Sequence, residues 1–301
     1  MIKFKELLFL KNLKGIGKAR IYGKYWKLLN SSDTLGSLAE KIIAEGNFSK
    51  DDVDKAIENA QNSYEYVLNN LEVHVITVFD DDYPDKLMVM KNKRPVFLYV
   101  KGDAEILKHP NIAVIGTRKP SAESEKFEKK AVKEIVTNSH RTVVSGLALG
   151  CDKIAHQTTV DENKTTIAVL PSGVDVITPS SNRNLAENIV KTGGCLISEY
   201  EPAAKAFKGT YVERDALIAA LSDGTFVVEC KVKSGTMHTV EAALKYNRKV
   251  MAYLPKDSSK GNYDGNIAIL ENKKTLKISD FKDFTEDKIE INDNSTQQKL
   301  M

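Results

Sequence analysis

The fold is decided by NIAVIGTRKPSAESEKFEKKAVKEIVTNSHRTVVSGLALGCDKIAH, the stretch from residue 111 to residue 156. It begins with an apolar run of strand type, 112–115, and passes through a tight turn into a charged, helix-forming segment that ends near residue 139. A second apolar run, 142–144, leads through another glycine-containing turn into a second helical segment. Two successive strand-to-helix units of this kind predict part of a parallel α/β sheet.

Each of these two turns combines glycine with hydroxyl residues. The first is Gly116-Thr117-Arg118, and the second starts at Ser145-Gly146. Backbone N–H groups at such turns are unpaired and lie at the positive end of a helix dipole, so they attract phosphate. The alternative is that the glycines only make the turn. Two such turns, one with an arginine directly after the strand, favour an anionic ligand. The pattern matches neither the dinucleotide fingerprint nor a P-loop.

Composition places few further limits on function. The 301 residues are 42% hydrophobic and 28% charged with a net charge of +3, which suits one large and one small domain with at most a local basic groove. No apolar run reaches membrane-spanning length and no secretory leader is evident, so we expect a cytoplasmic protein without membrane contact. The three cysteines, Cys151, Cys195 and Cys230, form no CxxC pair, so we expect neither a disulfide framework nor a metal or cofactor site.

Residues 1–70 have the apolar spacing of a small helical domain. The turn Gly15-Ile16-Gly17, between Lys14 and Lys18, resembles a helix-hairpin-helix, in which backbone N–H groups and lysines meet a DNA phosphate. The alternative is a docking domain whose glycines only let two helices cross closely. From the residues alone we favour docking, because no other nucleic-acid signal is evident in the chain.

The main domain is expected over residues 71–282, where strand and helix alternate. Two strand-like runs, 73–78 and 95–100, lead into it. Further strands are predicted at 165–170, 195–199, 225–230 and 250–253, and further helices at 183–191, 214–222 and 236–244. Such alternation predicts a doubly wound, mostly parallel sheet covered on both faces, with its turn residues aligned along one edge. The polar residues 283–301 are predicted to be a disordered tail.

Over roughly residues 80–280 the sequence resembles the DNA-processing protein A family, also called Smf. The motifs that carry the resemblance are Gly116-Thr117-Arg118, SGLALGCD at 145–152, Ile197-Ser198-Glu199, Arg214, Val227-Val228-Glu229 and Ser234-Gly235-Thr236. The resemblance implies a Rossmann-like domain that binds single-stranded DNA, often as a homodimer, and promotes loading of the RecA recombinase in recombination and natural transformation. It implies no enzymatic reaction. A helical N-terminal domain is common in the family, which favours a DNA-associated module with secondary contacts from Lys14, Gly15, Gly17 and Lys18.

Carried over by position, the resemblance implies a set of DNA-binding residues. They are Gly116, Thr117, Arg118, Ser145, Gly146, Lys205, Phe207, Lys208, Tyr211, Arg214, Ser234, Gly235 and Thr236. Arg118 would grip phosphate with its planar fork, and Lys205 and Lys208 would extend the basic path from the loop before the Arg214 helix. Tyr211 would stack on a base, its alternative being a ring packed on the sheet edge. Asp152 and Glu199 are expected to brace the turns by accepting backbone N–H bonds.

The sequence departs from the family pattern at one motif. The family's Arg-Asn-Arg is Arg214-Asp215-Ala216 here, which removes one cation and adds a carboxylate beside the expected groove. A groove that neutralises one phosphate fewer binds DNA more weakly and with less sensitivity to salt.

A nucleotide-binding sensor, or a phosphoribohydrolase of the lysine decarboxylase-like superfamily, is the competing hypothesis. Such enzymes carry a glycine-rich turn with a nearby glutamate that stabilises charge at a ribose carbon. The nearest equivalent is Ser234-Gly235-Thr236 followed by Glu241, but the double glycine is missing. Glu241 is also interpretable as a solvated helix residue or a partner of Arg248.

Overall fold

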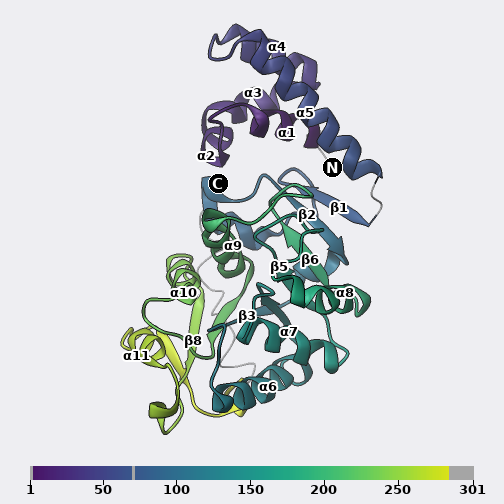
Figure 1. Ribbon diagram of the computed structural model, residues 1–301. Helices are drawn as coiled ribbons and strands as arrows, with labels where there is room; N and C mark the ends of the chain where they lie inside the picture. The colour runs from purple at the N-terminus through teal and green to yellow at the C-terminus, as the bar shows by residue number, and fades with distance from the viewer. Residues whose placement is uncertain (1–2, 70–71, 285–301) are drawn as a thin grey trace.

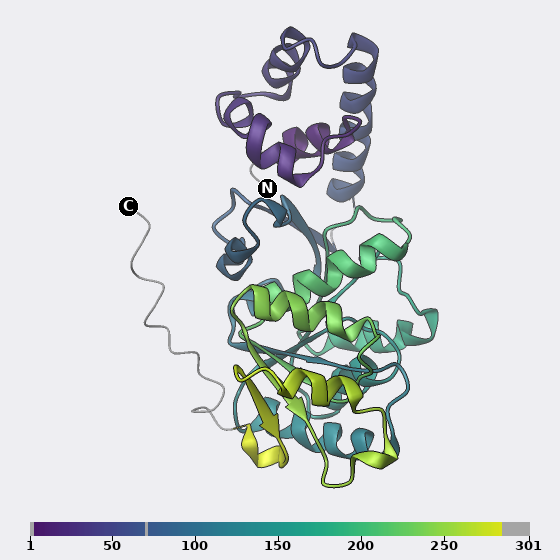
Figure 2. The same ribbon diagram turned by 90° about the vertical axis from the view of Figure 1, so that its left-hand side faces the viewer.

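The computed structural model describes residues 3–69 and 72–284. A group of helices formed by the N-terminal residues lies at one end of a larger α/β part (Figure 1). A view turned by 90° shows the same arrangement, with the N-terminal helices above the sheet and the helices that cover it (Figure 2).

The N-terminal part is helical, as the apolar spacing predicted. Its helices are α1 (Phe4–Asn12), α2 (Lys18–Arg20), α3 (Trp26–Asn30), α4 (Leu35–Ala44) and α5 (Lys50–Asn69), with a π-helical turn at Ile21–Tyr25 between α2 and α3. Capping fixes where α4 begins, because Thr34 accepts a hydrogen bond from the backbone N–H of Ser37. Two acidic residues, Asp51 and Asp52, lie in the first turn of α5, where they complement the helix dipole.

The α/β part is built on one mixed sheet. The described strands are β1 (Val73–Thr77), β2 (Phe97–Gly102), β3 (Asn111–Ile115), β4 (Thr142–Ser145), β5 (Thr166–Val169), β6 (Cys195–Ser198), β7 (Gly224–Val227), β8 (Lys249–Tyr253) and β9 (Thr275–Ile278). Their order across the sheet is β1-β2-β6-β5-β4-β3-β7-β8-β9. In this order, all strands from β6 across the sheet to β9, including β5, β4 and β3, are parallel. At the other edge, β2 pairs antiparallel with β6, and β1 pairs antiparallel with β2. The predicted doubly wound, mostly parallel sheet is confirmed.

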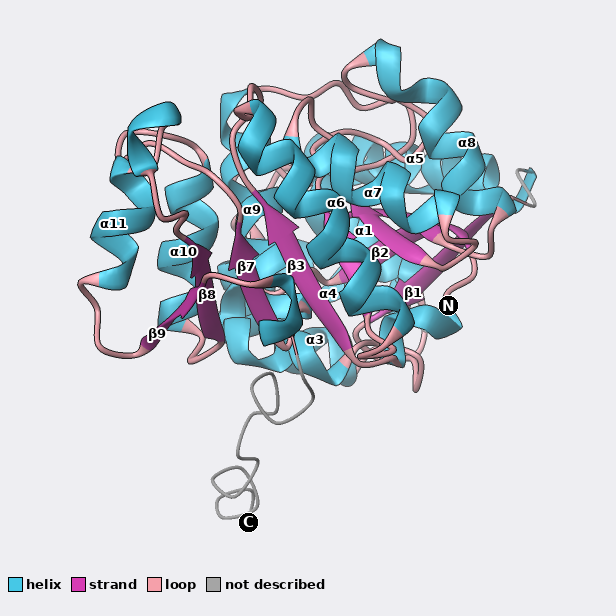
Figure 3. Ribbon diagram, turned by 90° about the horizontal axis from the view of Figure 1, so that it is seen from below, coloured by secondary structure: helices cyan, strands magenta, loops and turns pink. Residues whose placement is uncertain are grey.

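Helices cover both faces of this sheet (Figure 3). They are α6 (Ala122–Thr137), α7 (Cys151–Asp161), α8 (Arg183–Lys191), α9 (Lys208–Leu221), α10 (Thr236–Lys245) and α11 (Asp264–Leu270). Alternate residues of β3 serve the two faces: Ile112 and Val114 belong to the apolar cluster with α6 and α7, whereas Ala113 and Ile115 belong to the cluster with α9 and α10. The helices that follow the parallel neighbours β3 and β7, α6 and α10, therefore lie on opposite faces of the sheet.

Two boundaries and two elements differ from the prediction. Helix α9 begins at Lys208 rather than near Arg214, so Lys208 and Tyr211 are helical residues and not loop residues. The helix α11 and the strand β9 were not predicted. The predicted tail started too early, because Phe284 is buried against the sheet, and its remainder, 285–301, lies outside the described residues.

The N-terminal helices pack directly on β1 and β2. Phe4 of α1 shares an apolar cluster with Phe97 and Tyr99 of β2, and its ring meets that of Phe97 edge to face with centroids 5.2 Å apart. Because this cluster is continuous across residue 70, the domain boundary predicted there stays a prediction.

Candidate functional site

A cavity of about 500 Å³ lies where the sheet changes winding direction, beyond the carboxyl ends of β3 and β7. Open α/β sheets bind ligands at this point, because the two outgoing connections diverge and leave a crevice. The cavity is lined by nine of the predicted DNA-binding residues: Gly116, Thr117, Arg118, Lys208, Tyr211, Arg214, Ser234, Gly235 and Thr236. The structure therefore brings together turns that are more than a hundred residues apart in sequence.

Arg118 is an exposed cation of this cavity. Its guanidinium carbon lies 5.9 Å from the ring centroid of Tyr211, and that of Arg214 lies 5.9 Å from the same centroid. Both distances are within cation–π range. The ring of Tyr211 is half-buried and lines the cavity, so an aromatic face and a solvent-exposed arginine lie side by side at its mouth.

Gly116 lets the turn after β3 lie against the start of α7. A Cβ atom at this position would lie 2.5 Å from Sγ of Cys151, so glycine is required here. The backbone N–H of Thr117 donates to Glu229 O at 2.7 Å, and Thr117 O accepts from the N–H of Cys151 at 3.1 Å. These bonds hold the turn in place, and the side chain of Arg118 is exposed to solvent.

Glu229 is a supporting residue that the prediction missed. It follows β7, and its carboxylate accepts from the N–H and hydroxyl of Ser121 and from the N–H of Asn262. Although burial opposes ionisation, these hydrogen bonds lower the pKa of Glu229. The acidic residue directly after an apolar strand was the available signal, since a carboxylate there can accept N–H groups from neighbouring turns.

The turn after β4 is occupied by the protein's own groups. Ser145 donates its hydroxyl to Val114 O at 2.7 Å, and Asp152 accepts from the N–H groups of Gly146 and Ala148 at 3.1 and 3.4 Å. Asp152 therefore has the bracing contacts expected of it. The phosphate contacts predicted for Ser145 and Gly146 are not supported, because their donors already have partners.

Arg214 requires a larger correction. Its side chain is only 6% exposed, and Nη1 donates to Gly146 O and Val169 O, while Nε lies 3.0 Å from Oδ1 of Asp215. The guanidinium thus joins the ends of two strands and is not available to grip phosphate. Helix α9 directs this side chain inward, which no local pattern revealed.

Asp215 is an acidic residue in the lining of the same cavity. Burial raises its pKa to about 6, against the opposing effect of Arg214. His156 of α7 is buried outside the cavity lining, with Nδ1 2.8 Å from the hydroxyl of Thr166, and burial lowers its pKa to about 3. The Cys151 thiol is buried, and burial raises its pKa well above the usual value. Neither His156 nor Cys151 has the exposure and activation of a nucleophile or general base.

Two further predicted residues, Lys205 and Phe207, lie at the start of α9 next to Lys208. Lys205, Phe207 and Lys208 are all exposed, and Phe207 is 65% exposed. We call these three residues together with Arg118 and Tyr211 the basic ledge. It combines three cations with two aromatic rings, although only Arg118, Lys208 and Tyr211 also line the cavity.

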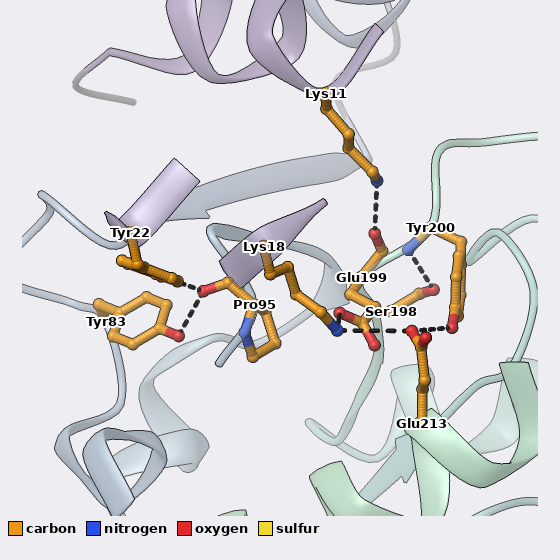
Figure 4. A network of polar contacts seen from close by, with 9 residues as sticks. All are labelled: Lys11, Lys18, Tyr22, Tyr83, Pro95, Ser198, Glu199, Tyr200 and Glu213. Atoms are coloured by element: carbon orange, nitrogen blue, oxygen red, sulfur yellow. Dashed lines mark hydrogen bonds and ion pairs between the residues drawn. The ribbon is translucent and has the colours of Figure 1, made fainter. Parts of the chain in front are cut away.

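The N-terminal hairpin docks on the α/β part through Lys18 (Figure 4). Its Nζ lies 2.6 Å from Glu199 Oε2 and 3.4 Å from Glu213 Oε2, and Glu213 also accepts from the hydroxyl of Tyr200. Burial opposes the charge on Lys18, but the two carboxylates outweigh it and raise its pKa. The DNA contact predicted for Lys18 is therefore not supported. Glu199 pairs with this lysine through its carboxylate, rather than bracing a turn through N–H groups as predicted.

Other contacts complete this interface. Lys11 donates to Glu199 O at 3.1 Å, and the Tyr22 hydroxyl donates to Pro95 O, which also accepts from Tyr83 within the α/β part, as Figure 4 shows. Lys18 and its neighbours in the N-terminal helices therefore dock these helices on the α/β part. Lys14, Gly15 and Gly17 lie on the surface, and their contact with DNA stays a prediction.

The residues of the competing enzyme hypothesis do not meet in the cavity. Glu241 is exposed on α10 and is absent from the cavity lining. Arg248 donates from Nη2 to the carbonyl oxygens of Lys86 and Ala220. In the described part of the chain, no group of three His, Cys, Asp or Glu residues is arranged to hold a metal ion, and no helix combines the length and apolarity needed to cross a membrane.

The doubly wound sheet with a cavity at its switch point defines a Rossmann-like fold, in which ligands bind at this position. The sequence matches the family model of DNA recombination-mediator protein A over residues 74–288, and the chain belongs to that family. It is 34% identical over 189 residues to DNA processing protein DprA of Streptococcus pneumoniae, covering 63% of this chain and 65% of the relative. It is 32% identical over 179 residues to protein Smf of Escherichia coli, covering 60% and 47%. The chain thus spans about half to two thirds of these relatives.

Solved structures agree with this assignment. The X-ray structure of DprA from Streptococcus pneumoniae has a TM-score of 0.78 at 27% identity and covers 94% of this chain and 96% of that one. A structure of DNA processing protein A from Helicobacter pylori, which concerns its single-stranded DNA binding mode, has a TM-score of 0.63 at 29% identity and covers 71% and 94%.

Proposed function

We propose that this protein binds single-stranded DNA along the basic ledge. The contacts to the DNA backbone depend little on the base sequence of the strand. The observation that carries the proposal is the position of Arg118, an exposed arginine beside the Tyr211 ring at the switch point of the sheet. Arginine binds two phosphate oxygens through its planar fork, and aromatic rings stack on any base. Family membership and the Helicobacter pylori relative support the same interpretation.

The start of α9 extends this surface. Lys208 begins the helix, Lys205 lies just before it, and the Phe207 ring between them is exposed. The positive end of the helix dipole and both lysines attract the DNA backbone, while Phe207 offers a second stacking platform. A strand that runs from Arg118 to Phe207 would therefore meet alternating charge and aromatic surface.

The first test removes the central cation. We expect Arg118→Ala to weaken binding of a labelled polythymidine strand about tenfold and to reduce the salt dependence of binding by about one phosphate contact. Fluorescence anisotropy at several salt concentrations measures both quantities. The matched control is Lys164→Ala, which removes one exposed cation just before β5, at the amino-terminal end of that strand. Equal binding by the Arg118 variant and the wild type would refute the proposed surface.

We further propose that the bound strand is protected and handed to a RecA-type recombinase, in recombination of the kind that natural transformation requires. Membership of the recombination-mediator family supports this role. The test is the ATPase rate of a purified recombinase on strands coated with single-strand-binding protein. Wild-type protein should accelerate it and the Arg118 variant should not, since the mediator must hold the strand to exchange it. A homodimer is the expected form, and light scattering measures its mass.

A further inference from the structure

Asp215 is out of place in a site that binds only phosphate. It lies on α9 and lines the cavity, and its side chain is 15% exposed. A carboxylate in a partly buried cavity repels phosphate and attracts groups that donate hydrogen bonds. The cations that suit phosphate, Arg118 and Lys208, are exposed at the mouth, so the cavity interior and its rim have different chemistry.

The interior has the size and walls of a base pocket. Its volume of about 500 Å³ exceeds that of a single nucleobase, and it is open at the mouth where the Tyr211 ring lies. Besides Asp215, its lining includes the hydroxyl residues Thr236 and Thr239 and the apolar Ile218. Proteins that read single strands turn individual bases out, stack them on aromatic rings and bond their pairing edges.

We propose that this cavity selects guanine among the bases of the bound strand, with Asp215 as the residue that reads it. The inference rests on the single-stranded DNA binding proposed above. Guanine is the base whose pairing edge presents two adjacent donors, N1–H and the N2 amino group, to the two oxygens of a carboxylate. Oδ1 of Asp215 contacts Arg214 Nε at 3.0 Å and keeps a lone pair for one of these donors.

The other bases fit the carboxylate less well. Thymine has a single donor, N3–H, between two carbonyl oxygens, and adenine and cytosine place an unprotonated ring nitrogen beside their amino group. Each of these acceptors would face a carboxylate oxygen and repel it. Guanine's remaining edge atom, O6, is an acceptor, and Arg118 and His238 in the lining are donors of the kind that it needs.

The test compares strands that differ in one base type. Labelled oligothymidine strands of equal length carry isolated guanine, inosine, adenine or cytosine, and anisotropy at fixed salt gives their affinities. We expect the guanine strand to bind wild-type protein about tenfold more tightly than plain oligothymidine. The inosine strand should lie between them, because inosine keeps O6 and N1–H but lacks the N2 amino group.

Asp215→Asn should abolish this preference while oligothymidine binding stays equal or improves, since a negative charge has been removed. The matched control is Glu241→Gln, which removes one exposed carboxylate outside the cavity and should keep the guanine preference. An Asp215→Asn variant that still prefers guanine would overturn the assignment of Asp215.

A second measurement uses the wild type alone. The charged and titratable groups that act on Asp215 are Arg214 on its own helix, Asp152 on α7 and His238 on α10, and the cations Arg118 and Lys208 line the same cavity. The pKa of Asp215 is about 6, so its carboxylate is ionised above this pH and protonated below it. The guanine preference should therefore be present above pH 6 and decline below it, whereas oligothymidine binding should not decline. A preference that persists at acidic pH would contradict the mechanism.

The outcomes separate the two proposals. Equal binding of all strands by the wild type would overturn guanine selection and leave single-stranded DNA binding intact. Failure to bind any strand would overturn both. A guanine preference that depends on Asp215 and on its ionisation supports the inference.

Discussion

At the scale of single residues, Arg214 and Gly146 are fitted to each other. The guanidinium of Arg214 lies so close to the backbone of Gly146 that a Cβ atom there would lie 1.5 Å from Nη1. Real Cβ atoms do not approach a neighbour so closely, so only glycine at position 146 leaves room for the Arg214 guanidinium. The buried charge then has backbone carbonyl partners from two strand ends, which is the condition for burying a guanidinium at all.

Gly146→Ala should therefore destabilise the fold by about 2–4 kcal/mol, because Arg214 must leave a site where its charge is compensated. Chemical denaturation measures the change in free energy of unfolding. Gly235→Ala is the control, since a Cβ atom at Gly235 has open space around it and its φ of −59° is helical. Its effect should stay within about 0.5 kcal/mol. Equal stability of the two variants would disprove the steric argument.

At the scale of elements, α9 links the cavity to the N-terminal helices. Lys208, Tyr211 and Asp215 line the cavity at helical spacing and so share one face. Glu213 lies on another side, where it meets Lys18 of the N-terminal hairpin. The same helix thus positions the candidate DNA-binding residues and anchors the docked hairpin.

Lys18→Ala should loosen this docking, because it leaves the buried carboxylate of Glu199 without its cation. We expect a loss of about 2–3 kcal/mol at neutral pH, less than for a fully buried pair because Lys18 is partly exposed. Burial already raises the pKa of Glu199, and removal of Lys18 raises it further. A group with a raised folded-state pKa loses stability as pH rises through that pKa, so the defect should be smaller in acid.

Denaturation of the wild type and the Lys18 variant at acidic and alkaline pH tests this trend, and hydrogen exchange in α1 and α2 localises it. Lys14→Ala removes an exposed cation from the same hairpin and should have little effect. A Lys18 defect that is independent of pH would mean that its pairing with Glu199 is not the cause.

At the scale of the whole molecule, the N-terminal helices act as a cover for the antiparallel edge of the sheet. Phe97 and Tyr99 of β2 are fully or almost fully buried, and Val75 of β1 lies in the same cluster with residues from α1, α4 and α5. An apolar sheet face of this kind needs a covering layer.

A chain that starts at residue 72 should therefore unfold at a lower temperature than the full chain and associate as its concentration rises. Differential scanning calorimetry and light scattering measure the two effects. Replacing Phe97 by serine in the shortened chain should reduce the association, because it removes exposed apolar surface. An unchanged melting temperature together with a monomeric mass would show that the two parts fold independently.

Much of the main fold was predictable from local sequence. Strands of a parallel sheet are buried on both faces, so they appear as short apolar runs such as 112–115, and the intervening helices have their own period. The turns that line the cavity were recognisable for the same reason, because they directly follow these runs. The helix α11 and strand β9 were missed because they are short and only partly apolar.

By itself, the sequence determined the alternation of strands and helices, the edge where their turns meet and the arginine that follows β3. Only the tertiary structure decided which cations are free. Lys18 pairs with Glu199 across 181 positions, and Arg214 bonds to Gly146 across 68. Local spacing specifies periodicity and turns, whereas the partner of a charged side chain depends on which distant segments packing brings within a few ångströms of it.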